Sequence, residues 1–196
     1  MFTGIINSIG KVTDIVDCDG DKIIFLDTCD LELNDVVLGD SICINGVCLT
    51  VTNMTETSIQ VDVSAETILC TNFDEYIPGT RVNLEKSLKA TDRMHGHIVS
   101  GHVDTVGIIV SIRNDARSVQ YDIDVPVKFR KYLCRKGSVC IDGVSLTIND
   151  IKEKCLSINI IPYTKSHTIF SDYIQGSKVN IEVDIVARYL ETLHQC

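Results

Sequence analysis

A duplication constrains the fold of this 196-residue chain more than any other feature. The segment Ser41-Ile-Cys-Ile-Asn-Gly-Val-Cys-Leu-Thr-Val51 returns 97 residues later as Ser138-Val-Cys-Ile-Asp-Gly-Val-Ser-Leu-Thr-Ile148, with seven of eleven positions identical. The same offset aligns residues 74–85 with 171–182 and residues 4–10 with 101–107. Because three separated blocks share one offset, the sequence indicates one small domain that occurs twice.

Each copy consists mainly of short β-branched segments. In the first copy they cover roughly residues 9–17, 22–28, 41–45, 48–54, 58–63 and 80–85, and turn sequences such as Asn45-Gly46 separate them. Six short strands at this spacing, without a regular strand–helix alternation, predict an all-β domain that forms a closed antiparallel barrel or a sandwich.

One segment after the second copy is clearly helical. Asp184 is a candidate N-cap, and Val186, Leu190 and Leu193 follow at helical spacing. This apolar stripe packs either on the chain's own barrel or on a partner subunit, and the pattern alone does not choose between the two.

Composition excludes several classes of function. The formal net charge is −9 and no basic stripe is present, which argues against nucleic-acid binding and against an anionic membrane surface. The first residues lack the features of a signal peptide, and no apolar run is as long as a membrane span. The nine cysteines are odd in number and form no Cys-x-x-Cys pair, so we expect free thiols in a reducing, cytoplasmic environment.

A strand with a small polar face follows each Asn-Gly or Asp-Gly turn. Such a face suits a surface on which something packs, although an ordinary half-exposed strand is the alternative. The apolar side chains expected to fill the barrels are Val47, Leu49, Val51, Val144, Leu146 and Ile148. The polar side chains expected on the other face are Cys48, Thr50, Thr52, Ser145, Thr147 and Asn149. Cys43 is placed opposite the polar face, as a small core hydrophobe.

Three histidines, His95, His97 and His102, fall within eight residues. A metal site would need further ligands at defined spacing, and none are present, so we expect no metal. A histidine beside a pocket can instead transfer protons near neutral pH. His102 is the stronger candidate because its counterpart in the first copy is Ile5, so the two copies differ there. They differ similarly at Cys48 against Ser145 and at Gly39 against Lys136.

Several motifs together resemble the α-chain type of riboflavin synthase over essentially the whole chain. They are Met1-Phe-Thr-Gly-Ile-Ile6, Asn45-Gly-Val-Cys-Leu-Thr-Val51, Gly96-His-Ile-Val-Ser-Gly-His102, Asp142-Gly-Val-Ser-Leu-Thr147 and Ile161-Pro162. The resemblance implies two six-stranded antiparallel Greek-key barrels, at 1–97 and 98–184, and an oligomerisation helix at 185–196. It also implies a homotrimer, in which the active site forms between the N-terminal barrel of one subunit and the C-terminal barrel of its neighbour.

The same resemblance implies a reaction. Two molecules of 6,7-dimethyl-8-ribityllumazine would give riboflavin and 5-amino-6-(ribitylamino)uracil by transfer of a four-carbon unit, with no metal or organic cofactor. Each barrel would bind one lumazine, and association with lumazine synthase is a further possible partnership.

The resemblance assigns site residues to positions of matching type. Residues tied to activity are Phe2, Ser41, Cys48, His97, His102, Ser145 and Asp184. The N-terminal pocket would contain Gly4, Ile5, Ile6, Cys48, Leu49, Thr50, Asp62, Val63, Ser64, Ala65, Glu66 and Thr67. The C-terminal pocket would contain Gly101, His102, Val103, Lys136, Ser145, Leu146, Thr147, Asn159, Ile160, Ile161, Pro162, Tyr163 and Thr164.

We hypothesise that Cys48 or Ser41 assists addition to a lumazine carbon and that His102 moves protons, with a bound water as the alternative nucleophile. Two positions depart from the family pattern. His95 replaces a common glycine, and because glycine adopts backbone conformations that histidine disfavours, the local backbone geometry could differ from that of the family. Tyr163 occupies a position that is variable in the family.

Two other functions are alternatives to the enzyme. A non-catalytic antenna protein of the same fold would depart at the reactive positions, whereas this chain keeps them. A flavin reductase barrel would need an Arg-x-Tyr-Ser/Thr motif and a nucleotide-binding domain. The candidate segment, Arg130-Lys-Tyr-Leu133, fails at its last position.

Overall fold

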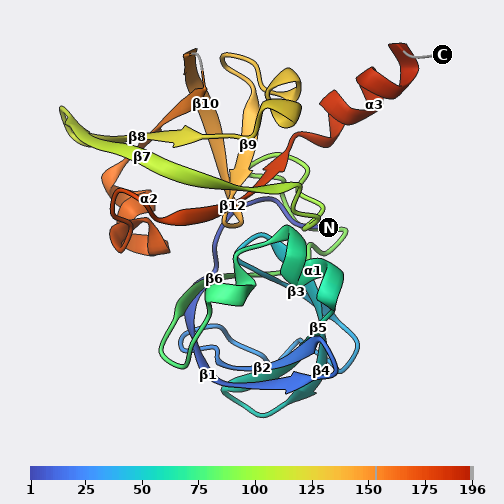
Figure 1. Cartoon of the computed structure of the whole chain (residues 1–196). Coiled ribbons are helices and arrows are strands. Elements are labelled where there is room, and N and C mark those ends of the chain that lie inside the picture. Colours follow the sequence, from blue (N-terminus) through green and yellow to red (C-terminus); the bar gives the residue numbers. More distant parts are fainter. Residues whose placement is uncertain (153, 195–196) are drawn as a thin grey trace.

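The computed structural model describes residues 1–152 and 154–194 and shows two β-barrels followed by a helix (Figure 1). The first barrel is closed, and all its neighbouring strands are antiparallel in the order β1-β2-β5-β4-β3-β6. Its strands are β1 (Ser8–Cys18), β2 (Asp21–Asp27), β3 (Ser41–Ile44), β4 (Val47–Met54), β5 (Ser58–Val63) and β6 (Arg81–Lys86). The six strands predicted from the sequence are all present, with ends within about two residues.

The second barrel repeats this topology. Its closed order, β7-β8-β11-β10-β9-β12, is that of the first barrel with each number raised by six. Its strands are β7 (Thr105–Asp115), β8 (Ser118–Asp124), β9 (Ser138–Ile141), β10 (Val144–Lys152), β11 (Cys155–Ile160) and β12 (Lys178–Val183). The predicted pair of six-stranded Greek-key barrels is therefore confirmed.

The alternation of β4 and β10 places their apolar side chains inward, as predicted. Val47, Leu49 and Val51 are buried within the first barrel. In the second barrel Val144 and Ile148 are buried and Leu146 packs against the same core while partly exposed. Burial of these two interiors is the main favourable term for each barrel.

Cys43 corrects one prediction. It is buried, but it lies outside the barrel core, in a cluster with Phe2, Val99 and Cys140 against which Cys48 packs. The turn at Asn45-Gly46 has only two residues, both with positive φ, so Cys43 stands directly opposite Cys48 in the β3–β4 ladder. Cross-strand partners share a face of the sheet, and Cys43 is therefore on the same face as Cys48.

The junction between the barrels has approximate two-fold symmetry. The Asn83 side chain donates to the main-chain oxygen of Asp142 at 2.8 Å, and the equivalent Asn180 donates to that of Asn45 at 2.9 Å. Two ion pairs, Arg81–Asp172 and Lys178–Glu75, cross the junction at equivalent positions. Each contact from the first copy to the second therefore has an equivalent contact from the second copy to the first, as expected for a two-fold axis.

Two short helices were not predicted. α1 (Ala65–Cys70) follows β5, and α2 (Pro162–His167) follows β11. Three 3₁₀ segments accompany them: Phe73–Glu75, Val127–Tyr132 and Ile169–Ser171. Six residues give fewer than two helical turns, too few for a periodic pattern. The ends carried local signals, because Ser64 caps α1 through the N–H of Thr67 and Pro162 is the first residue of α2.

The predicted terminal helix is α3 (Ile185–His194), which extends away from the barrels (Figure 1). Asp184 caps it by accepting from the N–H of Val186 at 3.0 Å. The stripe does not pack on the chain's own barrel: Val186, Leu190 and Leu193 are 54%, 53% and 72% exposed. Residues 195 and 196, included in the predicted segment, lie outside the described residues.

Polar contacts join the projecting helix α3 to the region of the second barrel. Arg188 pairs with Asp104, and Glu191 binds Lys131 and the Tyr132 hydroxyl. Within residues 1–152 and 154–194, no helix is long and apolar enough to cross a membrane. The eight cysteines among these residues are free thiols, and Cys196 lies outside them.

Candidate functional site

The two barrels exchange short segments at their junction. Residues 1–7 precede the first barrel, yet the main-chain oxygen of Gly4 accepts from the N–H of Ser145 in the second barrel at 2.8 Å. Residues 98–104 precede the second barrel, yet the oxygen of Gly101 accepts from the N–H of Cys48 in the first at 2.8 Å. We call these the crossing segments. Each therefore lies against the barrel that it does not precede.

This exchange places part of each predicted pocket group against the opposite barrel, and the grouping itself stays a prediction. Gly4, Ile5 and Ile6 were assigned to the N-terminal pocket, but Ile6 packs against the core of the second barrel. Gly101, His102 and Val103 were assigned to the C-terminal pocket, but Val103 packs against the first. An offset between repeats identifies equivalent residues, but it does not say which barrel a connecting segment contacts.

The predicted site residues on the first barrel, which we call the first group, come from β4, the end of β5 and the start of α1. Ser41 pairs with Thr50 across the β3–β4 ladder, so it shares the face of Cys48 and Thr50. The Thr52 hydroxyl reaches the Asp62 carboxylate at 3.4 Å, which ties β4 to the strand that leads into α1. On the first barrel, Cys48 therefore contacts Gly101 directly, and β5, which carries Asp62, is the neighbouring strand of β4.

The predicted site residues on the second barrel, which we call the second group, come from the equivalent elements β10, β11 and α2. Nδ1 of His97 lies 2.7 Å from Oγ of Ser145, and the His97 N–H donates to the oxygen of Thr3 at 3.2 Å. Burial lowers the pKa of His97, and the Asp184 carboxylate opposes this shift. A neutral imidazole beside a serine hydroxyl can accept its proton.

Lys136 and Asn159 belong to the same group. Lys136 has φ +69°, a region that costs ordinary side chains energy, and its N–H donates to Ile148 at 2.8 Å. Gly39 occupies the equivalent place in the first copy with φ +94°. The Asn159 amide donates to Asp115 at 2.6 Å. The two copies therefore share this backbone conformation, and they differ in that a lysine rather than a glycine adopts it in the second copy.

Phe2 lies at the centre of the junction. It is fully buried and forms an antiparallel bridge with Val99, its equivalent in the second copy. Its position therefore fixes both crossing segments at once. The substitution at His95 leaves the backbone in an ordinary conformation, because His95 is not among the described residues with positive φ. Gly96 is the constrained glycine, since a Cβ there would lie 2.0 Å from the oxygen of Thr3.

Tyr163, the other departure, points its ring at His167 on the same short helix. The two rings stack with centroids 4.1 Å apart, and Tyr163 is an exposed residue. It therefore contributes an aromatic surface at the start of α2, next to Ile161 and Pro162.

Two buried glutamates at the site were missed from the sequence. Glu85 accepts hydrogen bonds from Thr3 and Gly4, and Glu182 from Ser100, Gly101 and His102. A signal was available, because both are the last residue of an aligned Val-Asn-Leu/Ile-Glu segment. A glutamate repeated on a strand that otherwise faces apolar surroundings needs a buried partner.

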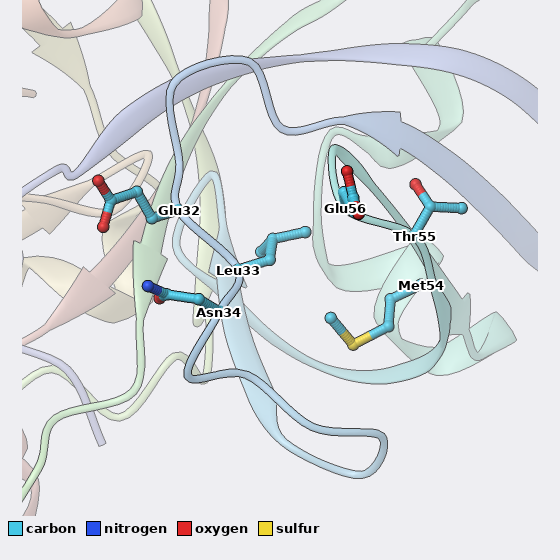
Figure 2. Close-up of a pocket in the computed structure, with 6 residues that line it drawn as sticks. All are labelled: Glu32, Leu33, Asn34, Met54, Thr55 and Glu56. Carbon is cyan, nitrogen blue, oxygen red and sulfur yellow. The ribbon is translucent and has the colours of Figure 1, made fainter.

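A separate pocket lies between the 28–40 loop and the β4–β5 hairpin. Figure 2 shows its lining residues, Glu32, Leu33, Asn34, Met54, Thr55 and Glu56. None of them is a predicted site residue. Among residues 1–152 and 154–194, no group of three or more histidine, cysteine, aspartate or glutamate side chains is arranged to hold a metal ion.

Comparisons with known proteins agree with this architecture. The family model for the lumazine binding domain matches residues 3–87 and again residues 100–184. Riboflavin synthase of Photobacterium leiognathi is 45% identical over 193 residues, covering 98% of this chain and 88% of the relative. Riboflavin synthase of Bacillus subtilis (strain 168) is 43% identical over 190 residues, covering 97% and 88%.

A solved structure shares the fold as well as part of the sequence. The crystal structure of LumP complexed with 6,7-dimethyl-8-(1'-D-ribityl) lumazine has a TM-score of 0.84 and 25% identity, and the match covers 93% of this chain and 99% of LumP. The identity to the synthases is higher, and it extends over nearly the whole chain. The chain therefore belongs to the riboflavin synthase family of tandem lumazine-binding barrels.

Proposed function

We propose that this protein is a riboflavin synthase, which converts two molecules of 6,7-dimethyl-8-ribityllumazine into riboflavin and 5-amino-6-(ribitylamino)uracil. The identity of 45% to a riboflavin synthase over nearly the full chain supports the enzyme. The single structural observation that carries the proposal is the pair of equivalent sites with unequal chemistry. One site presents Cys48 and the other Ser145, each held by a glycine of a crossing segment.

The reaction needs this inequality. One lumazine must give four carbons and the other must receive them, although the two molecules are identical. Together they contain all the atoms of both products, so no outside oxidant or carbon donor is required. Two sites that hold the rings in a fixed relation supply much of the acceleration by orientation.

The groups at each site suit different parts of the chemistry. We assign addition to a lumazine carbon to Cys48 or Ser41, which lie on one face of the β3–β4 ladder. Proton transfer falls to His102 in the first group, and the His97–Ser145 pair offers a second acceptor. Main-chain groups and small hydroxyls such as those of Thr50 and Thr147 suit the amide-like edge of the ring.

The complete site would form between subunits of a homotrimer. The exposed apolar stripe of α3 supports this assembly. Contiguous exposed apolar side chains are typical of protein–protein interfaces, and here the helix of another copy would remove them from water. In that assembly the N-terminal barrel of one subunit faces the C-terminal barrel of its neighbour. Association with lumazine synthase and a cytoplasmic location remain predictions, as does the division of the chain at residues 97/98.

A turnover assay tests the proposal. The purified protein is mixed with an excess of 6,7-dimethyl-8-ribityllumazine, and visible absorbance is followed. We expect substrate to disappear over many turnovers while riboflavin appears at half the molar amount. A fluorescent complex that forms in proportion to protein and never turns over would contradict the enzyme and favour a LumP-like ligand carrier.

A further inference from the structure

Two glutamates that the proposed chemistry does not use are buried at the junction of the barrels. Glu85 on β6 and Glu182 on β12 occupy equivalent positions in the two copies, and each is 4% exposed. Neither belongs to any ion pair among the described residues. A buried carboxylate without a cationic partner needs hydrogen-bond donors that face both of its oxygens.

Each carboxylate takes these donors from one crossing segment. For Glu182, one oxygen accepts from the N–H and hydroxyl of Ser100 at 2.7 and 2.6 Å. Its other oxygen accepts from the N–H groups of Gly101 at 2.9 Å and His102 at 3.1 Å. Glu85 accepts from the N–H and hydroxyl of Thr3 at 2.7 and 2.9 Å and from the N–H of Gly4 at 3.0 Å.

The held segments reach the opposite barrel directly. Gly101, fixed through its N–H by Glu182, uses its oxygen to bind the N–H of Cys48. The approach is close, because a Cβ on Gly101 would lie 2.5 Å from the Cβ of Cys48. In the same way, the N–H of Gly4 donates to Glu85 and its oxygen accepts from the N–H of Ser145. A Cβ on Gly4 would lie 2.6 Å from the Cβ of Ser145.

We propose that Glu182 positions Cys48 and His102, that Glu85 positions Ser145, and that each barrel thereby aligns the reactive residue of the other. The roles of these three residues rest on the proposed function, whereas the hydrogen bonds do not. The two glutamates differ in what they position. Glu182 positions two predicted catalytic residues, Cys48 and His102, whereas Glu85 positions only Ser145. Glu85 and Glu182 are positioning residues, because neither is required to touch substrate.

Thiol labelling distinguishes positioning from general stabilisation. In E182Q, the side-chain NH₂ group replaces one carboxylate oxygen and faces main-chain N–H groups that also donate. Because two donors repel each other, we expect residues 100–102 to be released from the side chain at position 182. We expect iodoacetamide to label Cys48 about tenfold faster in E182Q, as for the loss of one hydrogen bond to a charged acceptor. Peptide mass spectrometry reports the rate, with exposed Cys29 as the internal reference.

E85Q is the matched control, because it changes an equally buried glutamate in the equivalent place. It should leave the labelling of Cys48 unchanged, as should E75Q, which removes an exposed charge at the same junction. Equal acceleration in E85Q and E182Q would show a merely structural role and overturn the proposal. Unchanged labelling in a folded E182Q variant would also overturn it.

The reciprocal arm uses Ser145→Cys to place a thiol in the other site. In this background E85Q should accelerate labelling at position 145, and E182Q should not. If E182Q or E85Q fails to fold, S100A and T3A replace them, since each removes only the hydroxyl donor to one glutamate. S100A should then affect Cys48 alone, and T3A position 145 alone; any other pattern would contradict the proposal.

Kinetics add a separate readout. E182Q should lower kcat by at least about tenfold while changing KM far less, because misplaced reactive groups affect the transition state most. E85Q should lower kcat less than E182Q does. If the unmodified protein forms no riboflavin, the proposed function fails, but the labelling pattern still decides whether the glutamates position the two sites.

Discussion

The N–H of Cys48 donates to the main-chain oxygen of Gly101 at 2.8 Å, across the junction of two barrels. The equivalent bond joins Ser145 to Gly4 at the same distance. The two barrels are therefore not independent modules joined by a linker. Each contributes a segment that binds a candidate site residue of the other, and this residue is a thiol, Cys48, in one barrel and a hydroxyl, Ser145, in the other.

G101A should reduce turnover by at least about tenfold, since displacements of about 1 Å at reacting groups have effects of this size. Gly101 has φ +81°, and an added Cβ would lie 2.5 Å from the Cβ of Cys48. G20A is the control, because Gly20 has φ +99° with no atom within 4 Å of an added Cβ. Both variants strain the backbone, so equal losses of turnover would show that displacement of Cys48 does not matter.

Cys48→Ser and His102→Gln should each lower the turnover number more than the affinity for 6,7-dimethyl-8-ribityllumazine. Both substitutions keep a polar group of similar size while changing its nucleophilicity or its capacity to carry a proton. Steady-state kinetics and fluorescence titration separate the two effects. Unchanged turnover in either variant would remove that residue from the mechanism.

Asp142 should make the folded state lose stability as the pH rises from about 4 to about 7. Burial raises its pKa from 3.8 to about 7, against the opposing hydrogen bonds from Tyr173 and the Asn180 N–H. Within this range the native carboxyl keeps a proton that the unfolded chain has released, so the unfolded state binds fewer protons. The two pKa values correspond to a loss on the order of 4 kcal/mol, which is complete above pH 7.

D142N should remove that dependence, because the first barrel already has Asn45 at the equivalent position, bonded to Tyr76 at 2.6 Å. Urea unfolding of both proteins at pH 5 and pH 8 measures it. The raised pKa values of buried Glu85 and Glu182 act in the same direction, so the informative quantity is the difference between wild type and D142N. A difference that does not grow with pH would contradict the account.

Leu190→Glu should dissociate the proposed trimer. Leu190 is 53% exposed on α3 between Val186 and Leu193, and burying one leucine side chain contributes roughly 2 kcal/mol. Sedimentation velocity at matched protein concentrations reports the assembly. Val37→Glu changes an exposed apolar residue in the 28–40 loop and should leave the trimer intact. A wild-type protein that sediments as a monomer would refute the assembly itself.

Strand positions were predictable because alternation and turns are local properties. The register at Cys43 was also available, since a two-residue turn at Asn45-Gly46 pairs positions 43 and 48, but the prediction used alternation alone. The helices α1 and α2 were too short to show a period. Asp184 as a helix cap was predicted correctly from residue type and position.

The arrangement of the site was less accessible to sequence reasoning. The repeat identified Gly4 and Gly101 as equivalent, but only three-dimensional packing determines that each contacts the other barrel. The pairing of His97 with Ser145 likewise joins residues 48 positions apart. Positions where the copies differ drew attention to Cys48, His102 and Lys136, whose roles stay predictions, whereas Glu85 and Glu182 were missed because the two copies agree there.

The central claim is that one chain holds two lumazines in two unequal sites. Isothermal titration calorimetry of His102→Gln with 6,7-dimethyl-8-ribityllumazine tests this claim most directly, because this variant keeps the difference between Cys48 and Ser145 while slow turnover leaves the substrate intact during the measurement. We predict two molecules bound per chain, with distinct affinities for the two barrels. Saturation at one molecule per chain, or two sites of identical affinity, would contradict the account.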